Sequence, residues 1–263
     1  MTVTYLDRIV ARHREVAATD GRRLDDVIEV ARRAAPPRPF RDALTGRPEL
    51  AVIAEIKRRS PSKGALNVGL DPVAVAVAYA AGGAAALSVL TDEEFFSGSV
   101  RDLQTARDAS GLPVLRKDFT VCALDVADAR AMGADAVLLI AAALDRVEII
   151  GFHHLAVELG LDVLVEIHDE TELEVALECG ATMIGVNQRD LVTFEVDHAR
   201  AERMATAIPD GVVKVAESGV RDGGDARRLA DAGYDAVLVG ETLVTSPDPV
   251  GELASLRVMP SMR

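Results

Sequence analysis

Aromatic residues are scarce in this sequence: Phe, Trp and Tyr make up 3% of the 263 residues and Trp is absent, although 49% of the residues are hydrophobic. Proteins that bind single-stranded nucleic acid stack bases on aromatic rings, so this scarcity argues against that class. The formal net charge of −13 also repels phosphate backbones. Nucleic acid is therefore not expected as a partner.

Cysteine is scarce too, since only Cys122 and Cys179 occur and they form no CxxC or disulfide-dense pattern. This usage indicates a reduced, cytoplasmic protein. No apolar run is long enough to span a bilayer, and none before Arg22 is typical of a secretory signal, so no membrane partner is expected. The GxGxxG, HxxxH and HExxH patterns are absent, so neither a dinucleotide cofactor nor a metal is predicted.

What the sequence has in quantity is alternation of strand-forming and helix-forming segments. Eight short, apolar runs are the expected strands: AVIAEIK (51–57), AALSVL (85–90), LPVLRK (112–117), DAVLLIA (135–141), DVLVEIH (162–168), ATMIGVN (181–187), VVKVAES (212–218) and DAVLVGE (235–241). Ala-rich helical stretches separate them, and several end in Gly. Eight such βαβ repeats predict an α/β fold, a closed (β/α)8 TIM barrel, with an open doubly wound sheet as the alternative.

The chain before the first strand differs in pattern. Residues 2–35 have apolar side chains at helical spacing, and the PPRP segment at 36–39 ends that pattern. We expect one domain overall, with an N-terminal helical extension over residues 1–47 and the (β/α)8 barrel over 48–263. The extension is too short to hold a core of its own, and either covers the barrel mouth or mediates contacts.

Polar side chains interrupt the expected strands near their carboxyl ends, where barrels of this kind place their active sites. They are Glu55, Lys57, Lys117, Glu166, Asn187 and Glu217. Because side chains alternate along a strand, Glu55 and Lys57 share a face with Ile53. One such charge is usually solvated, but lysines and carboxylates gathered at one end of a barrel predict an enzyme whose charged groups shift one another's pKa values.

Two glycine turns predict a phosphate site. Gly219 follows the seventh strand in ESGV (217–220), and Gly240 follows the eighth in GETL (240–243). The loops after these strands often bind phosphate in this fold, and a short helix after Gly240 would aim N–H groups at the anion. The long basic loop RRSPSKGALNVG (58–69) is expected to be a lid or binding loop. A small phosphorylated molecule is the expected substrate.

Seven motifs resemble, in order, those of the indole-3-glycerol phosphate synthase family. They are AEIKRRSPSKG (54–64), SVLTDEEFFSGS (88–99), LRKDF (115–119), VEIHDETELE (165–174), GVNQRDL (185–191), AESGV (216–220) and LVGETLV (238–244). The resemblance implies a carboxy-lyase of tryptophan biosynthesis that needs no cofactor or metal. The family converts 1-(2-carboxyphenylamino)-1-deoxyribulose 5-phosphate into indole-3-glycerol phosphate, with loss of carbon dioxide and water.

Two alternative functions remain open at this point. One is a non-catalytic regulatory barrel that binds a phosphorylated ligand, and the other is a different sugar-phosphate isomerase. An isomerase of the neighbouring pathway step would be expected to show a catalytic Cys–Asp pair, whereas both cysteines fall in helical segments. Complexes with other tryptophan-pathway enzymes are also left open by the resemblance.

The resemblance implies a role for each candidate residue. Lys117 is the general acid on the ketone oxygen, and Lys57 holds the substrate carboxylate and is a second candidate acid for dehydration. Glu166 takes up a proton or stabilises the developing cation. The ribulose hydroxyls are bound by Glu55, Asn187 and Glu217. The phosphate is bound by Ser60, Ser218, Gly219, Gly240 and the backbone of Glu241. Arg189 supports Asn187 and the substrate, and Phe96, Phe119 and Ile140 either wall the anthranilate ring or belong to the core. His168 is expected to cap the following helix.

Overall fold

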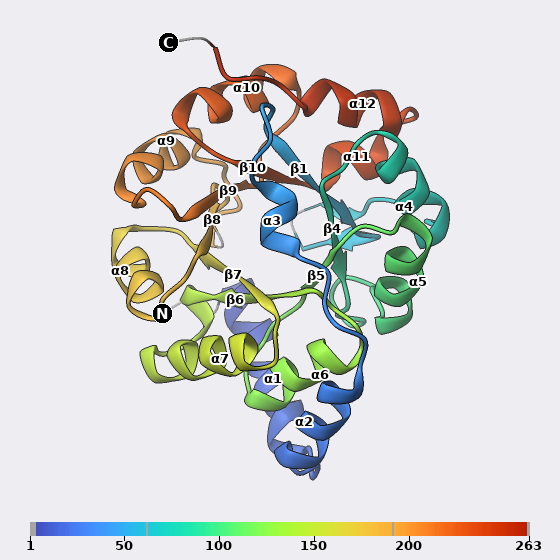
Figure 1. Ribbon diagram of the computed structural model, residues 1–263, viewed down its shortest axis with the longest axis vertical. Coiled ribbons are helices and arrows are strands. Elements are labelled where there is room, and N and C mark those ends of the chain that lie inside the picture. Colours follow the sequence, from blue (N-terminus) through green and yellow to red (C-terminus); the bar gives the residue numbers. More distant parts are fainter. Residues whose placement is uncertain (1–3, 62, 191, 262–263) are drawn as a thin grey trace.

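The computed structural model describes residues 4–61, 63–190 and 192–261 (Figure 1). Eight parallel strands close into a barrel in the order β1-β10-β9-β8-β7-β6-β5-β4, which confirms the predicted fold. The strands are β1 (Ala51–Ile56), β4 (Ala86–Leu90), β5 (Val114–Lys117), β6 (Ala136–Ile140), β7 (Asp162–Ile167), β8 (Met183–Asn187), β9 (Val213–Glu217) and β10 (Ala236–Val239). Each falls within a segment predicted from the sequence.

Helices surround the barrel as an outer ring (Figure 1). They are α4 (Pro72–Ala81), α5 (Val100–Ser110), α6 (Ala123–Ala131), α7 (Arg146–Glu158), α8 (Glu170–Glu178), α9 (His198–Ala207) and α10 (Gly223–Ala232), with a 3-10 turn η1 (Ala141–Ala143), and α11 (Glu241–Thr245) and α12 (Pro249–Leu256) after the last strand. Most begin at an Asp or Ser side chain that accepts a backbone N–H of the first turn, as Ser99 does for α5 and Asp145 for α7.

Alternate strand residues separate two apolar cores. In β1, Ala51 and Ile53 belong to the core inside the barrel, whereas Val52, Ala54 and Ile56 belong to the core between strands and helices. Glu55 continues the inward-facing row and is buried. The inward row of β1 is therefore apolar near its start and ionisable near its carboxyl end, as strand alternation predicts.

Three helices precede β1: α1 (Tyr5–Thr19), α2 (Leu24–Arg33) and α3 (Phe40–Leu44). The helical pattern predicted over residues 2–35 forms two helices, because α1 ends at Thr19 and α2 starts after Arg23. α2 packs beside α6, and α3 crosses the centre of the ring of helices (Figure 1). Phe40 and Leu44 join the core inside the barrel and close the end at which the strands begin.

The loop after β1 contains a short antiparallel pair, β2 (Arg59–Ser60) and β3 (Gly64–Ala65). The guanidinium of Arg58 anchors this hairpin, since it pairs with Asp102 in α5 and donates to the carbonyl of Leu70 at 3.2 Å. Among the described helices, none combines the length and the apolar character needed to cross a membrane.

Candidate active site

A cavity of about 580 Å³ lies over the carboxyl ends of the strands. Its size is that of a small-molecule site, and its place is the usual one for the active site of this fold. Every site residue singled out from the sequence lines it: Glu55, Lys57, Ser60, Phe96, Lys117, Phe119, Ile140, Glu166, Asn187, Arg189, Glu217, Ser218, Gly219, Gly240 and Glu241. Phe96, Phe119 and Ile140 therefore border the cavity as well as packing on their neighbours.

Lys117 is the centre of the polar network. Its Nζ donates to Glu166 Oε2 at 2.9 Å and to Glu217 Oε2 at 3.1 Å. The amide of Asn187 donates to the other oxygen of Glu166 at 3.0 Å. Glu217 Oε1 is buried and accepts no hydrogen bond from any described residue.

Strand register brings these residues to one level. Ile140 of β6 pairs with Glu166 of β7, and Asn187 of β8 pairs with Glu217 of β9. Because adjacent strands lie about 4.8 Å apart, side chains at matching positions inside the barrel are close enough to bond directly. The network is therefore a consequence of the register and needs no loop to form it.

Burial and mutual charge separate the pKa values of this network. Burial would lower the pKa of Lys117, but the charges of Glu166 and Glu217 outweigh it and hold that pKa above its ordinary value. Burial, together with the charge of Glu166, raises the pKa of Glu217 to about 7 in spite of Lys117. Burial would also raise the pKa of Glu166, but Lys117, His168 and Asn187 lower it to about 2. The two carboxylates share one ammonium, so one of them holds a proton far more readily than the other.

Lys57 and Glu55 form a second ion pair, which lines the cavity where β1 ends. Gly240, after β10, is adjacent to this pair. A Cβ on Gly240 would overlap Glu55 Oε2 and come within 3.1 Å of Lys57 Nζ. Glycine at position 240 therefore makes room for the pair, besides shaping the turn that was predicted to bind phosphate.

The predicted phosphate turn after β9 has a strained backbone. Ser218 has a φ of 66° and Gly219 a φ of 75°, which is the left-handed region that few residues other than glycine adopt. Gln188 holds this turn, because its Nε2 donates to the carbonyl of Ser218 at 2.7 Å. His198 in turn bonds Gln188 Oε1 at 3.1 Å. Consecutive N–H groups in such a turn form a concave anion site.

The short helix predicted after Gly240 is confirmed as α11. Glu241, its first residue, was expected to contribute only its backbone N–H. Its side chain instead pairs with Lys63 Nζ at 3.3 Å, and both residues line the cavity. Lys63 belongs to the basic loop identified in the sequence, but its position beside the phosphate turns could not be read from that loop alone.

Helix α1 also lines the cavity, through Tyr5, Leu6 and Ile9. Of the two roles that the sequence left open for the N-terminal extension, the structure thus supports covering the barrel mouth. No motif marked these three residues, because their apolar spacing is that of any amphipathic helix. Gln188 was also missed, although it lies within the motif GVNQRDL.

His168 does not cap α8 with its side chain. The cap is Asp169, whose side chain accepts the N–H of Glu172. His168 Nδ1 bonds Glu172 at 3.1 Å, and its Nε2 lies 3.9 Å from Glu166 Oε1. Neither cysteine lines the cavity, and burial raises the pKa of the Cys122 thiol to about 11. A thiolate catalyst is therefore not provided at this site.

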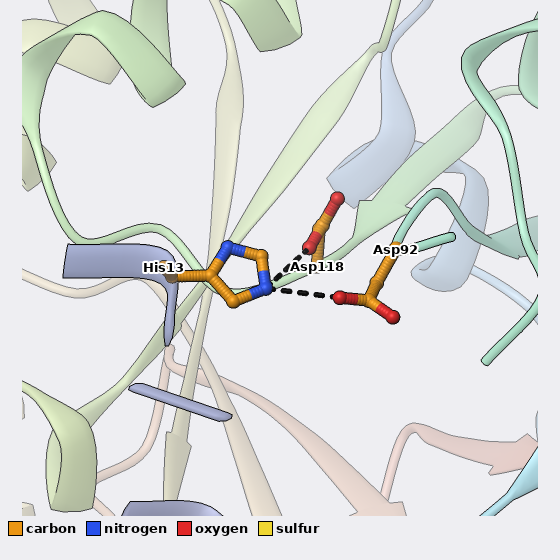
Figure 2. Close-up of side chains that lie close together, drawn as sticks. All are labelled: His13, Asp92 and Asp118. Atoms are coloured by element: carbon orange, nitrogen blue, oxygen red, sulfur yellow. Dashed lines mark hydrogen bonds and ion pairs between the residues drawn. The ribbon is translucent and has the colours of Figure 1, made fainter. Parts of the chain in front are cut away.

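One group of side chains in the described part of the chain has the donor types that can hold a metal ion: His13, Asp92 and Asp118, here called the His13 cluster. Figure 2 shows both carboxylates on the side of the His13 ring that carries Nε2. His13 Nε2 lies 3.0 Å from Asp92 Oδ2 and 3.9 Å from Asp118 Oδ1. Since each carboxylate also accepts hydrogen bonds from its own loop, the arrangement is that of an imidazole paired with two carboxylates.

Fold and site together define a class of protein, the (β/α)8-barrel enzymes that hold a small phosphorylated molecule over the carboxyl ends of the strands. The family model described as "Indole-3-glycerol phosphate synthase" matches residues 6–256. The chain belongs to the indole-3-glycerol phosphate synthase family, carboxy-lyases of tryptophan biosynthesis.

Similar proteins agree with this assignment. Indole-3-glycerol phosphate synthase of Parafrankia sp. is 52% identical over 228 residues, which cover 85% of each chain. The synthase of Desulfotalea psychrophila is 47% identical over 254 residues, 95% of this chain and 97% of the relative. Among solved structures, 3-hexulose-6-phosphate synthase from Salmonella typhimurium has a TM-score of 0.61 at 17% identity, and covers 79% of this chain and 96% of its own. That likeness shows the fold alone.

Proposed function

We propose that ring closure of 1-(2-carboxyphenylamino)-1-deoxyribulose 5-phosphate takes place in this cavity, with Lys117 as the acid that protonates the ketone oxygen. The position of the Lys117 ammonium carries the proposal, because it is buried between Glu166 and Glu217 among the ends of β5, β7 and β9. Two carboxylates keep this group charged and fix its direction, as proton donation to a bound substrate requires.

The strand order supports one orientation of the substrate. Phe96, Phe119 and Ile140 follow or end β4, β5 and β6, which are neighbours in the barrel. The phosphate turns follow β9 and β10, which are neighbours on the opposite side of the ring. The anthranilate ring therefore lies at the first group and the phosphate at the second. The ribulose chain then passes the ends of β7, β8 and β9, where Glu166, Asn187 and Glu217 meet it.

In the first step, the ring carbon that bears the carboxylate attacks the ketone carbon while Lys117 gives a proton to the ketone oxygen. Lys57, paired with Glu55, holds the carboxylate in place for this step. The carboxylate then leaves as carbon dioxide, and the electron pair of the broken bond returns to the ring. The new hydroxyl leaves as water after a second protonation, and Glu166 takes the proton lost from the methylene carbon next to the nitrogen, so that the double bond of the indole ring forms.

Glu217 has the properties needed to return a proton to Lys117. It lies 3.1 Å from Nζ, and its pKa of about 7 leaves it partly protonated at neutral pH. A carboxyl whose pKa is near the working pH exchanges protons efficiently in both directions. Arg189, whose backbone N–H bonds Asn187 Oδ1 at 3.0 Å, keeps the Asn187 amide turned toward Glu166.

The test is a fluorescence assay for the indole product, run with EDTA and without added cofactor on the wild type, Lys117→Ala and a control, Lys214→Ala. Lys214 bonds the carbonyl of Ala205 and does not line the cavity. We expect wild-type and control activity, and a loss of roughly 10²-fold or more in Lys117→Ala with an unchanged circular dichroism spectrum. Full activity of Lys117→Ala would remove this lysine from the mechanism. A wild type that binds a substrate analogue without turnover would favour the regulatory barrel.

The phosphorylated substrate is the partner that the family implies. A cytoplasmic location, complexes with other tryptophan-pathway enzymes, and the division into an extension (1–47) and a barrel (48–263) that fold as one domain stay predictions from the sequence.

A further inference from the structure

The His13 cluster joins three elements at the mouth of the barrel. His13 belongs to α1, Asp92 follows β4, and Asp118 directly follows Lys117 at the end of β5. On the same helix, Ile9 lies one turn before His13 and lines the cavity with Tyr5. The cluster is therefore a polar contact between the helix that covers the cavity and the barrel beneath it (Figure 2).

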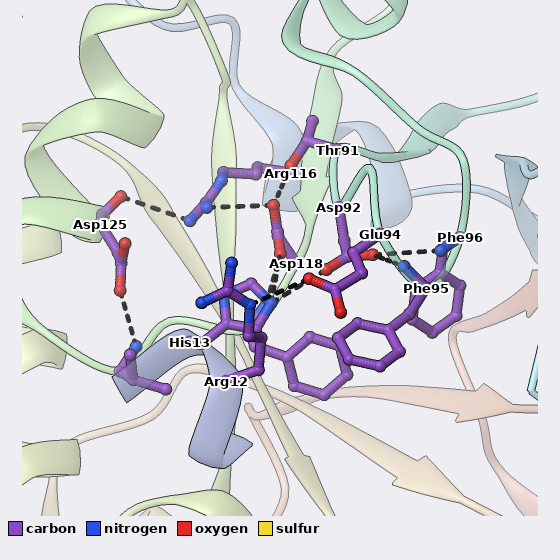
Figure 3. A network of polar contacts seen from close by, with 12 residues as sticks. Arg12, His13, Thr91, Asp92, Glu94, Phe95, Phe96, Arg116, Asp118 and Asp125 are labelled. Atoms are coloured by element: carbon purple, nitrogen blue, oxygen red, sulfur yellow. Dashed lines mark hydrogen bonds and ion pairs between the residues drawn. The ribbon is translucent and has the colours of Figure 1, made fainter. Parts of the chain in front are cut away.

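The same two carboxylates shape the loops that carry the aromatic wall. Asp92 Oδ1 accepts the backbone N–H groups of Phe95 at 2.6 Å and Phe96 at 3.1 Å, as Figure 3 shows. Asp118 Oδ1 accepts the N–H of Phe119 at 2.8 Å. A change in either carboxylate is thus passed directly to the backbone of a ring that borders the cavity.

Ring contacts follow the same path. The His13 ring lies 5.4 Å from the Phe119 ring, and the Phe119 ring lies 6.1 Å from that of Phe96. These centroid distances are typical of packed aromatic pairs. His13 therefore contacts the aromatic wall both through its polar partners and through its own ring.

We propose that His13 is a positioning residue for the aromatic end of the cavity, which fixes α1 against the loops of Phe96 and Phe119. The proposal rests on the proposed function, in which these rings bind the anthranilate part of the substrate. His13 does not line the cavity itself, so it acts through α1 and the two loops.

The charges around His13 make this role dependent on pH. Burial would lower the pKa of His13, but the hydrogen bond with Asp92 and the charges of nearby carboxylates outweigh it and raise that pKa above its ordinary value of 6.5. The charged groups of the surrounding elements are Asp92, Asp118, Asp125, Glu94, Arg12 and Arg116 (Figure 3). At a pH below this raised pKa the imidazole of His13 is protonated, and at a pH above it the proton is lost. The contact between His13 and the two carboxylates therefore weakens as pH rises through that value.

Other contacts keep α1 in place when the cluster is weakened. Arg14 forms two hydrogen bonds with Glu148, at 2.7 and 2.8 Å, and Arg12 bonds Glu94 at 3.0 Å. Substitution of His13 is therefore expected to loosen the aromatic end without unfolding the barrel. This makes the variants suitable for kinetic tests.

The test compares His13→Gln, which keeps a neutral hydrogen-bonding side chain, with His13→Lys, which keeps the charge. His154→Gln on the exposed side of α7 is the control. We expect KM for the substrate to rise roughly 10-fold in His13→Gln, the effect of losing one charged hydrogen bond, with little change in kcat. The ratio of wild-type KM to His13→Lys KM should rise with pH above 6.5. Comparing this ratio cancels titration of the substrate phosphate.

Two further measurements separate this proposal from the proposed function. Inhibition by inorganic phosphate should be unchanged in both variants, because the phosphate turns lie on the opposite side of the barrel. Amide hydrogen exchange of α1 and residues 92–98 should be faster in His13→Gln than in the wild type, and this needs no turnover. Unchanged exchange and KM in His13→Gln would overturn the role of His13. Faster exchange in an enzyme without turnover would instead retain the positioning contact and reject the proposed function.

Discussion

Gly185 in β8 leaves the space that the carboxylate of Glu217 occupies. A Cβ at position 185 would overlap Glu217 Oε1 and approach Leu164 Cδ1 to 3.2 Å. Glu217 Oε2 bonds Lys117 at 3.1 Å. The absence of a side chain at position 185 in β8 therefore makes room for the ion pair between Glu217 of β9 and Lys117 of β5. This glycine is thus required for space, at a position where its backbone is that of an ordinary strand.

Gly185→Ala is expected to move the Glu217 carboxylate away from Lys117, and so to lower kcat by roughly 10-fold or more, since an ångström-scale displacement at a catalytic group has this effect. Steady-state kinetics would measure it. Gly151→Ala in α7 is the matched control, because a Cβ there meets nothing within 4 Å. Equal kcat values in the two variants would mean that Glu217 does not need its present position.

Glu217 should also make stability depend on pH. Its pKa is raised to about 7 from an ordinary 4.5, so its contribution favours the folded state below 4.5 and is lost as pH rises through 7. Glu166 has the opposite sign, and its contribution is lost only as pH falls toward 2. The unfolding free energy of the wild type should therefore fall between pH 5 and pH 8. That of Glu217→Gln should fall less, and the difference between the two falls should be on the order of 3 kcal/mol.

Urea unfolding at the two pH values gives this difference, with Glu195→Gln, outside the network, as the control. The same variant should lack the inflexion near pH 7 in its kcat profile, if Glu217 returns the proton to Lys117. If the pH profile of kcat in Glu217→Gln keeps the wild-type inflexion, that inflexion belongs to another group.

Lys63 is expected to bind the substrate phosphate. It lines the cavity beside the phosphate turns, where its Nζ pairs with the half-exposed Glu241. Lys63→Ala should raise KM and the inhibition constant of inorganic phosphate roughly 10-fold, with kcat unchanged, because a cation contributes equally to ground-state and transition-state binding of a distant group. Arg59→Ala in the same hairpin, outside the cavity, should change neither constant. A fall in kcat with constant KM would contradict a binding role.

Asp135 is expected to support stability without affecting catalysis. It is fully buried just before β6, at the end of the barrel away from the cavity. Its carboxylate accepts hydrogen bonds from the side chain of Arg107 and from the backbone N–H groups of Arg38 and Val114. Asp135→Asn should lower the unfolding free energy by roughly 3 kcal/mol, the cost of leaving a buried charge without its partner. kcat should not change. The exposed Asp108→Asn, also near Arg107, should shift stability by less than about 0.5 kcal/mol.

Much of the fold could be predicted because strand and helix periods alternate so regularly. The position of the site followed from the same pattern, since closing eight parallel strands brings all their carboxyl ends to one side. Lys117, Glu166 and Glu217 could therefore be placed together without knowing any distance between them. The break in the first helix at Asp20–Arg23 was missed, because the apolar spacing resumes on its far side and only Gly21 marks it.

Contacts between distant segments could not be predicted. His13 and Asp92 are 79 positions apart, and no sequence pattern around either residue indicates that the two are in contact. Gln188 lies in a recognised motif, but its task of holding the Ser218 carbonyl depends on a backbone turn that only the structure shows. The pairing of Lys63 with Glu241 likewise depends on how the first loop meets the last.

The N-terminal segment touches both openings of the barrel, with α1 at one and α3 at the other. Its partners are made late during synthesis: Arg14 of α1 bonds Glu148, 134 positions further along the chain. This segment is synthesised before its partners and must therefore wait for much of the barrel before it can dock, and contacts between such distant positions slow folding. We expect the substrate-binding wall to be completed after the barrel has closed, so a nascent chain acquires its architecture before it acquires its activity.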